Sequence, residues 1–188
     1  MFQSMTRSLA IPHFLYTRAV DLTPLMSLRK RFAIDPSLSS HLKTGDSTAK
    51  LTPLPFVLKA LSQAVTAFLA LNSILYTEMD PNWPHIIVKA AHNFGVAIDT
   101  RSRLLVSVVK NVQNHSVISL AAELSRVGAL AREGCLGPGD MRGATLVVSN
   151  IGSIGGQTVA PVILSPMTAV GACVQEGWSG SSRDISSC

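Results

Sequence analysis

The ten residues VVSNIGSIGG at positions 147–156 place hydroxyl, amide and glycine residues at the end of an apolar run. A turn of this kind can cradle a phosphate, present a serine nucleophile, or simply require small residues. A P-loop needs Lys and then Ser or Thr after its last glycine, whereas Gln157 follows here. The letters GxSxG around Ser153 match a nucleophile elbow, but Pro161 and the apolar run after it do not suit the helix that such an elbow requires. Spacing alone therefore favours a plain loop.

The composition predicts one folded domain with a sizeable core. The chain has 188 residues, of which 47% are hydrophobic and 14% are charged, and this excludes a disordered tail. So few charges predict that part of the surface is covered, most simply by self-association. The net charge of +5 suits an anionic ligand such as a nucleotide or coenzyme. Nucleic acid is disfavoured, because aromatic residues are 5% and the basic residues are dispersed apart from 29–31.

Cysteine usage and apolar runs exclude further classes. The 3 cysteines lie far apart, and no histidine has metal-ligand spacing, so we expect neither a disulfide framework nor a metal site. The uncharged runs 60–77 and 143–175 are interrupted by polar residues, glycines and prolines, which favours buried elements over membrane spans. The first residues match neither a signal peptide nor a transit peptide, so no targeting segment is expected.

Periodicity in the first half of the chain predicts one strand and two helices. We expect a strand at 11–22, and then a short helix at 23–32 with Thr23 as N-cap and Pro24 at its first position. A polar loop is expected at 33–50. The run 51–75 predicts the main core helix, whose buried side would be formed by Val57, Leu61, Val65, Phe68 and Leu69.

In the second half, strands alternate with one clear helix. The strand-like runs 85–100 and 104–112 are separated by RSR, which predicts a hairpin or neighbouring strands. The run 116–134 starts with serine and ends in glycine, as a capped helix does. Further strands are expected before Ser149 and at 160–174. The mixed order predicts an α/β fold with two layers, a mixed sheet packed with helices.

Six segments taken together resemble one known family. They occur in a fixed order along the chain: MTRSLAIPHF, PFVLKA, AAHNFGVAIDT, VVKNV, AAELSR and VVSNIGSIGG. The chain resembles the catalytic domain of dihydrolipoyl acyltransferases, the core subunits of 2-oxo acid dehydrogenase complexes, and is most similar to the branched-chain member. The resemblance covers roughly residues 3–175. We therefore expect a partial acyltransferase domain at 1–175 and a divergent polar tail at 176–188.

The resemblance implies a chloramphenicol acetyltransferase-like fold that forms trimers and, from them, a larger core. Such domains move an acyl group between dihydrolipoamide and CoA, which enter a channel at the subunit interface from opposite ends. The expected partners are a lipoyl group on a separate domain or chain and the other subunits of the complex. The expected location is the mitochondrial matrix.

The resemblance also assigns roles to individual residues. Ser149 matches the serine that donates a hydrogen bond to the oxyanion of the tetrahedral intermediate, a role whose loss typically costs about 10²–10³ in rate. Asn150 and Asp99 match residues beside CoA. Arg29 matches an arginine suited to a CoA phosphate, and Thr52 stands where the family often has a serine that touches CoA.

Several positions depart from the family pattern. The family's general base is the histidine of an HxxxDG motif, but none of the 5 histidines here has an aspartate four residues later. We expect an end truncated before this motif, with weak or no activity of the chain alone; the alternative is a non-catalytic assembly or CoA-binding subunit. Arg103 and Ser107 replace a usual glycine and proline, and Gly128 replaces a polar residue near CoA. His13 and His92 are expected to be structural.

Overall fold

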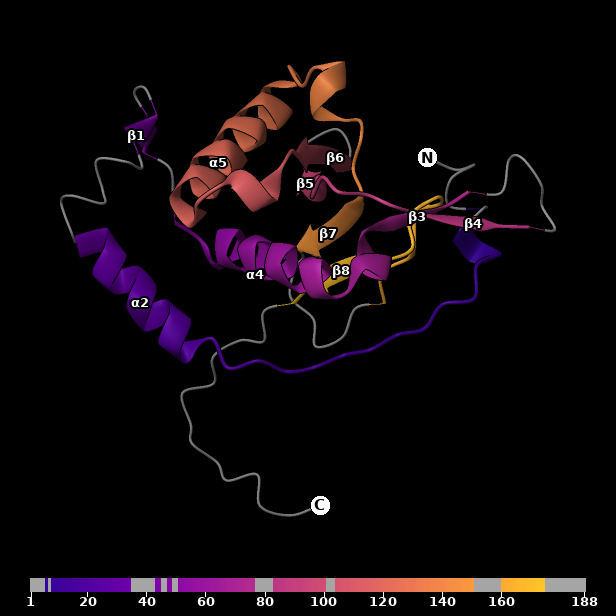
Figure 1. The fold of residues 1–188 in the computed structure, drawn as a ribbon. Helices are drawn as coiled ribbons and strands as arrows, with labels where there is room; N and C mark the ends of the chain where they lie inside the picture. Colours follow the sequence, from indigo (N-terminus) through magenta and orange to yellow (C-terminus); the bar gives the residue numbers. More distant parts are fainter. Residues whose placement is uncertain are drawn as a thin grey trace, which may run out of the picture.

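The computed structural model describes residues 6, 8–34, 43–44, 47–48, 51–76, 83–100, 104–150 and 160–174. Its centre is a four-stranded mixed sheet in the order β6-β5-β7-β8 (Figure 1). The predicted turn residues 151–156, the turn around Arg103 and the tail at 176–188 lie outside the described residues.

Two kinds of pairing build this sheet. The strands β5 (Phe94–Asp99) and β6 (Leu104–Val109) are antiparallel neighbours, which confirms the predicted pairing of the two runs. The strand β7 (Leu146–Asn150) lies parallel to β5, and β8 (Val170–Cys173) lies parallel to β7. Parallel neighbours need a long crossover, and the helix between β6 and β7 provides it. The predicted α/β class with a mixed sheet is confirmed.

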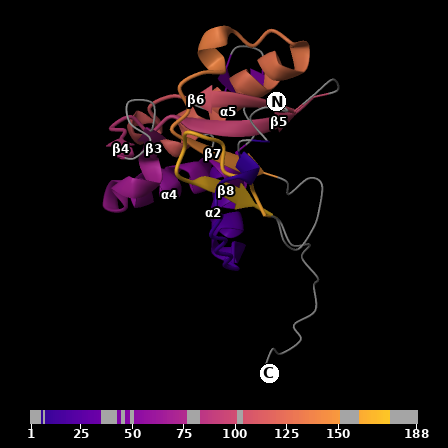
Figure 2. The same ribbon diagram turned by 90° about the vertical axis from the view of Figure 1, so that its right-hand side faces the viewer.

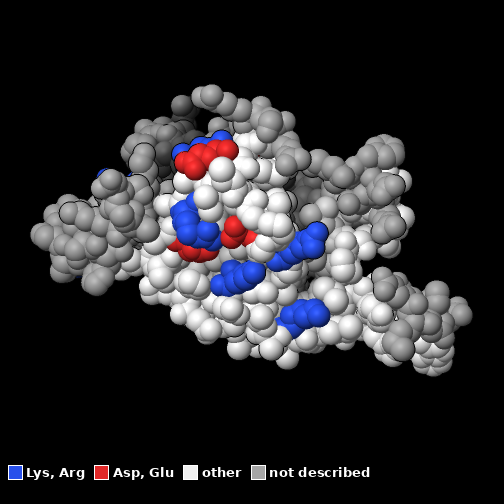
Figure 3. All heavy atoms as spheres, turned by 90° about the horizontal axis from the view of Figure 1, so that it is seen from above, with Lys and Arg blue, Asp and Glu red and all other residues white. Residues whose placement is uncertain are grey.

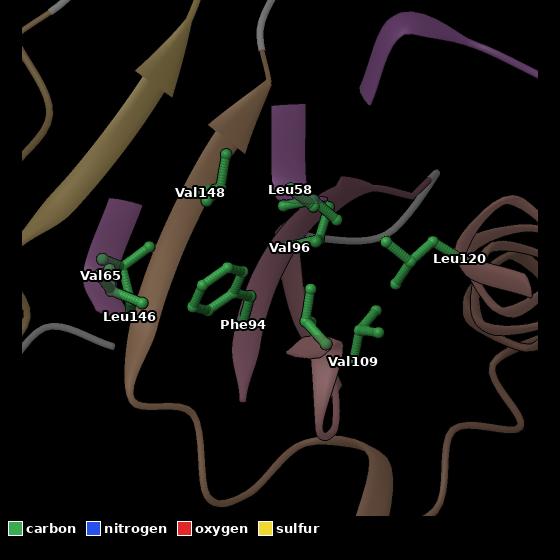
Figure 4. Close-up of a cluster of buried hydrophobic side chains, with 9 residues drawn as sticks. Leu58, Val65, Phe94, Val96, Val109, Leu120, Leu146 and Val148 are labelled. Atoms are coloured by element: carbon green, nitrogen blue, oxygen red, sulfur yellow. The ribbon is translucent and has the colours of Figure 1, made fainter. Parts of the chain in front are cut away.

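Two helices cover one face of the sheet. They are α4 (Pro53–Ala67) and α5 (Val117–Glu133), which pack side by side. The amide of Ser119 donates to Oγ of Ser116 at 3.1 Å, and Gly134 ends α5 at a φ of 72°, so both predicted caps are confirmed. The core between these layers is apolar throughout (Figure 4); it contains Leu58, Val65, Phe94, Val96, Val109, Val112, Leu120, Leu146 and Val148.

The predicted helix 51–75 is too long. After α4 ends at Ala67, a 3₁₀ turn η2 (Leu69–Asn72) leads into strand β3 (Ser73–Tyr76), which pairs with β4 (His85–Val88). The side chain of Asn72 donates to the carbonyl oxygens of Lys89 and Ala91, at 2.7 and 3.1 Å. Such side-chain bonds to distant backbone compete with the helix and end it.

The buried side of α4 consequently differs from the prediction. Phe68 and Leu69 lie beyond the helix and are exposed. The buried positions are Pro55, Leu58, Ser62 and Val65. The helical periodicity of this run was misleading, because the run joins a helix to a partly exposed strand.

The predicted strand at 11–22 is wrong. Residues 12–22 run as an exposed arm, and no strand of the described chain pairs with them. A lone strand leaves its backbone groups without partners, so β-branched and aromatic residues alone do not make one. The arm leads to α2 (Thr23–Ile34), which lies to one side of the main sheet in Figure 1 and below β8 in Figure 2.

The start of α2 also differs from the prediction. Thr23 is the first helical residue, and its amide donates to Oδ1 of Asp21 at 2.8 Å. Asp21 therefore satisfies the first free amide in place of the predicted Thr23 side chain. Within the predicted polar loop, the described pieces include a minimal pair of strands, β1 (Lys43–Thr44) and β2 (Ser47–Thr48).

The predicted last strand at 160–174 is shorter in the structure. Only β8 is a strand; before it the chain makes one isolated bridge, from Met167 to Ile74. Pro161 and Pro166 lack an amide hydrogen, which keeps this stretch from forming a continuous ladder. In the described part of the chain, no helix combines the length and apolar character that a membrane span requires.

Candidate functional site at the carboxyl end of the parallel strands

Ser149 and Asn150 are the last two residues of β7, between β5 and β8. In β8, Ala172 lies beside Ser149 and Cys173 lies beside Asn150. Side chains alternate between the faces of a strand, and Val148 is buried in the helix-covered core. Ser149 therefore lies on the opposite face, where it is half-buried, while Asn150 is exposed.

Asp99 ends β5 at the same edge of the sheet. Because β5 and β7 are parallel, their carboxyl ends meet there. The pair Gly95–Val147 shows that the odd-numbered residues of both strands share one face. Asp99 and Ser149 are thus on the same face and at the same edge, and Asp99 is exposed. The structure brings together three of the five predicted site residues.

The other two predicted residues lie on other elements. Thr52 precedes α4 in an extended conformation, and its side chain makes no capping hydrogen bond with the helix. Arg29 is half-buried on α2, which lies to one side of the main sheet (Figure 1). Arg29 therefore does not belong to the strand-end group within one chain.

His13 and His92, which we expected to be structural, both form hydrogen bonds. Nδ1 of His92 shares a hydrogen bond of 2.8 Å with Oγ of Ser62, and its ring stacks on Phe94. Burial lowers the pKa of His92, and the nearby positive charge of Lys59 lowers it further. Nε2 of His13 accepts from the amide of Ile163 at 2.9 Å, which joins the arm to the segment before β8.

An ionic group lies on the outer side of α5. The guanidinium of Arg126 donates to Glu123 at 2.7 Å and to Asp140 at 3.0 Å, and it holds the pKa of both carboxyl groups below the usual range. Asp140 ends the turn η4 (Pro138–Asp140), and the hydroxyl of the buried Ser107 donates to its carbonyl at 3.3 Å. Figure 3 shows a face of the molecule on which acidic side chains lie next to basic ones among many uncharged atoms. Exposed pairs of this kind contribute little stability.

The described residues contain no group of three or more His, Cys, Asp or Glu side chains that could hold a metal ion. Cys135 is a free, exposed thiol, and Cys173 is free and half-buried. Burial raises the pKa of the Cys173 thiol, so it is a poor nucleophile at neutral pH.

Sequence reasoning missed two residues that support this site. Asn93 immediately precedes β5, and Thr145 immediately precedes β7. The side chain of Asn93 bonds to backbone atoms of Asn111 and Gly143, and that of Thr145 bonds to backbone atoms of Asn93. A polar residue directly before an apolar strand was the only signal, and it does not reveal a partner 52 residues away.

Comparison with known proteins agrees with this arrangement. The family model described as the 2-oxoacid dehydrogenases acyltransferase (catalytic domain) matches residues 1–177. The lipoamide acyltransferase component of the mitochondrial branched-chain alpha-keto acid dehydrogenase complex of Mus musculus is 42% identical over 92% of this chain and 33% of its own length. The acetyltransferase component of the Bacillus subtilis pyruvate dehydrogenase complex is 40% identical over 85% of this chain and 33% of its own length. The chain thus spans about a third of these curated relatives.

Solved structures share the fold. An Azotobacter vinelandii dihydrolipoamide acetyltransferase, studied for the roles of a serine, a histidine and an asparagine in its mechanism, superimposes with a TM-score of 0.78 at 30% identity. That match covers 96% of this chain and 71% of the other. The cubic core of a pyruvate dehydrogenase multienzyme complex gives the same TM-score of 0.78, identity of 30% and coverages of 96% and 71%. The chain belongs to the family of 2-oxoacid dehydrogenase acyltransferase catalytic domains.

Proposed function

We propose that this chain contributes a half-site for acyl transfer between dihydrolipoamide and CoA, with Ser149 as the oxyanion donor. One observation carries the proposal: Ser149 is half-buried at the carboxyl end of β7, on the face of the sheet that α4 and α5 leave uncovered. Its hydroxyl is therefore directed away from the apolar core and can face a substrate. Family membership supports the same chemistry.

The reaction needs a donor at the position where negative charge develops. A thiolate of CoA or dihydrolipoamide attacks the carbonyl carbon of the other partner's thioester and forms a new C–S bond. The carbonyl oxygen becomes an oxyanion, and it then re-forms the double bond as the old C–S bond breaks and the leaving thiolate takes a proton. The Ser149 hydroxyl would donate to the oxyanion, a contribution of about 10²–10³ in rate.

The proton acceptor for the attacking thiol would come from another subunit. The 188 residues contain no HxxxDG motif, and by resemblance this base reaches the site from a neighbouring subunit. A general base contributes about 10²–10⁴ in rate. We therefore propose that a neighbouring subunit of the assembly supplies the histidine and this chain supplies Ser149.

CoA would bind at the strand ends. Asn150 and Asp99 lie at the same edge as Ser149, and Thr52 has a hydroxyl that α4 does not use as a cap. Arg29, on the separate α2, would reach a CoA phosphate of a neighbouring copy. The lipoyl group would arrive on a separate domain or chain, and no metal takes part in this chemistry.

The proposed setting is a trimer or larger core within a 2-oxo acid dehydrogenase complex. One structural relative is the cubic core of such a complex. The mitochondrial naming of the mouse relative supports the mitochondrial matrix as the location. The Bacillus subtilis relative, 40% identical over 85% of this chain, is bacterial.

A second candidate is a subunit that assembles or binds CoA without transferring acyl groups. It is the alternative that the sequence leaves open. It predicts co-assembly without any gain of activity.

Complementation separates the two candidates. The partner is a complete family subunit in which the serine that corresponds to Ser149 is changed to alanine. This partner retains the histidine but lacks the oxyanion donor. We expect neither protein alone to transfer an acyl group from acyl-CoA to dihydrolipoamide, and the co-expressed pair to do so. Co-assembly on a sizing column without transfer would support the second candidate. Failure to co-assemble would contradict the mixed site.

A further inference from the structure

We propose that Asn93 and Thr145 form a clamp that sets the register of β7 against β5, and that they are positioning residues for Ser149. The consequence for catalysis rests on the proposed function. The register itself is a property of the fold and can be measured without any activity.

Asn93 ties together the two neighbours of β5. Its Oδ1 accepts from the amide of Asn111, just after β6, at 2.9 Å. Its Nδ2 donates to the carbonyl of Gly143, just before β7, at 3.1 Å. One amide side chain thus uses its acceptor on the β6 side and its donor on the β7 side.

Thr145 completes the clamp from the β7 side. Its amide donates to the carbonyl of Asn93 at 2.7 Å, and its Oγ1 accepts from the amide of Asn93 at 3.2 Å. Oγ1 also lies 3.2 Å from the carbonyl oxygen of Asn93, to which it can donate. Thr145 is buried, so these bonds are shielded from water.

The register between β5 and β7 needs specific hydrogen bonds, because the apolar pattern of the paired residues does not specify it. The residue pairs are Phe94–Leu146, Gly95–Val147 and Val96–Val148, and all three residues of β7 are apolar and buried. A slip by one residue would exchange one buried apolar residue for another within these pairs, so their apolar character alone does not select a register. The same slip would move Ser149 to the helix-covered face.

The hydrogen bonds before the strands distinguish the two registers. Thr145 immediately precedes β7 and Asn93 immediately precedes β5, so their mutual pairing places the first residues of both strands side by side. From that point, four residues of β7 lead to Ser149. The clamp therefore determines which face the hydroxyl occupies.

The test compares conservative and disruptive variants of both residues. Asn93→Asp keeps the acceptor for Asn111 but replaces the donor to Gly143 with an oxygen. Thr145→Val removes Oγ1 at nearly constant shape, whereas Thr145→Ser keeps it. Asn114→Asp, the same chemical change on an exposed residue of the turn η3 (Val112–Asn114), is the matched control.

The measurement is amide hydrogen exchange, read separately for β7 and α5. We expect Asn93→Asp and Thr145→Val to accelerate exchange in β7 about tenfold, as the loss of a hydrogen bond between the strands implies. Exchange in α5 should stay within about twofold of wild type, and Thr145→Ser and Asn114→Asp should resemble wild type. Equal acceleration of β7 and α5 would show a general loss of stability and would overturn the clamp. Unchanged β7 exchange would overturn it as well.

The catalytic consequence is read in the complementation assay. We expect Asn93→Asp to lower kcat about tenfold or more while KM for CoA stays within about threefold, because the oxyanion donor acts mainly in the transition state. A rise in KM with unchanged kcat would contradict the positioning role. If wild-type chain gives no transfer, the proposed function fails while the exchange experiment still decides the clamp. If Thr145→Val does not fold, the Asn93→Asp variant, which retains one of the two side-chain hydrogen bonds of Asn93, tests the clamp by itself.

Discussion

At the scale of single residues, the serine side chains differ in whether they are placed for catalysis or for stabilising the fold. Ser149 faces the uncovered side of the sheet, whereas Ser62 and Ser107 are buried and hydrogen-bonded inside the fold. The hydroxyl of Ser107 donates to the backbone carbonyl of Asp140. Burial and partner therefore separate a candidate catalytic serine from structural ones.

His92 should make the stability of the fold depend on pH. Its pKa is lowered in the folded protein, so below its ordinary value of about 6.5 the unfolded chain binds more protons than the folded one. The free energy of unfolding should therefore fall as pH drops through about 6.5. We expect a lower thermal midpoint at acid pH, measured by circular dichroism.

The variant His92→Asn isolates this effect. It keeps a polar group near Ser62 but does not titrate in this range, so its midpoint should depend less on pH than that of wild type. An equal pH dependence in both proteins would assign the effect to other groups.

Among the site residues, those with a local signal could be predicted. Ser149, Asn150 and Asp99 were assigned as site residues by resemblance because motif letters mark them, and the structure places all three at one edge. Asn93 and Thr145 were not predicted, because Asn93 bonds to backbone atoms of Asn111 and Gly143, and Thr145 bonds to those of Asn93. Such partners exist only once the strands have been paired.

At the scale of elements, close packing between β5 and its neighbours leaves no room at Gly95. A Cβ there would lie 2.9 Å from Cγ1 of Val106 and 3.1 Å from Cγ2 of Val147. We expect Gly95→Ala to lower the free energy of unfolding by about 1–3 kcal/mol, as overpacking does. Urea unfolding would measure it.

Gly171 supplies the matched control in the same sheet. A Cβ there would lie 3.9 Å from Cγ2 of Val148, which is ordinary contact. Gly171→Ala should therefore change stability by less than Gly95→Ala. Equal losses at both positions would contradict the packing argument.

Elements with their own end signals were predicted well, and those without them were not. The helix α5 has a serine cap and a terminal glycine, and both boundaries were found. The run 51–75 lacks a glycine or proline where α4 ends, and the break comes from the long-range bonds of Asn72. The arm at 12–22 has the composition of a strand, but no strand of the described chain pairs with it.

At the scale of the whole molecule, the arm leaves large apolar side chains in water. Phe14 is 90% exposed and Tyr16 is 72% exposed, and Leu15 and Val20 are exposed as well. Together with a charge content of 14%, this surface supports the prediction of self-association. A chain that exposes so much apolar surface is expected to cover it with another subunit.

The arm can be tested without disturbing the core. We expect Phe14→Ser with Tyr16→Ser to reduce the assembled mass in analytical ultracentrifugation and to leave the circular dichroism spectrum unchanged, because neither side chain packs in the core. The substitution Trp83→Ser, at another exposed aromatic residue, serves as control. An unchanged mass in the arm variant would exclude the arm as an assembly contact.

The measurement that tests the central claim most directly is the rate of acyl transfer in the mixed assembly, with and without the Ser149 hydroxyl. We predict that Ser149→Ala lowers kcat by about 10²–10³. Ser125→Ala, the same change on α5 away from the strand ends, should have little effect. A Ser149→Ala assembly that transfers acyl groups as fast as wild type would contradict the account.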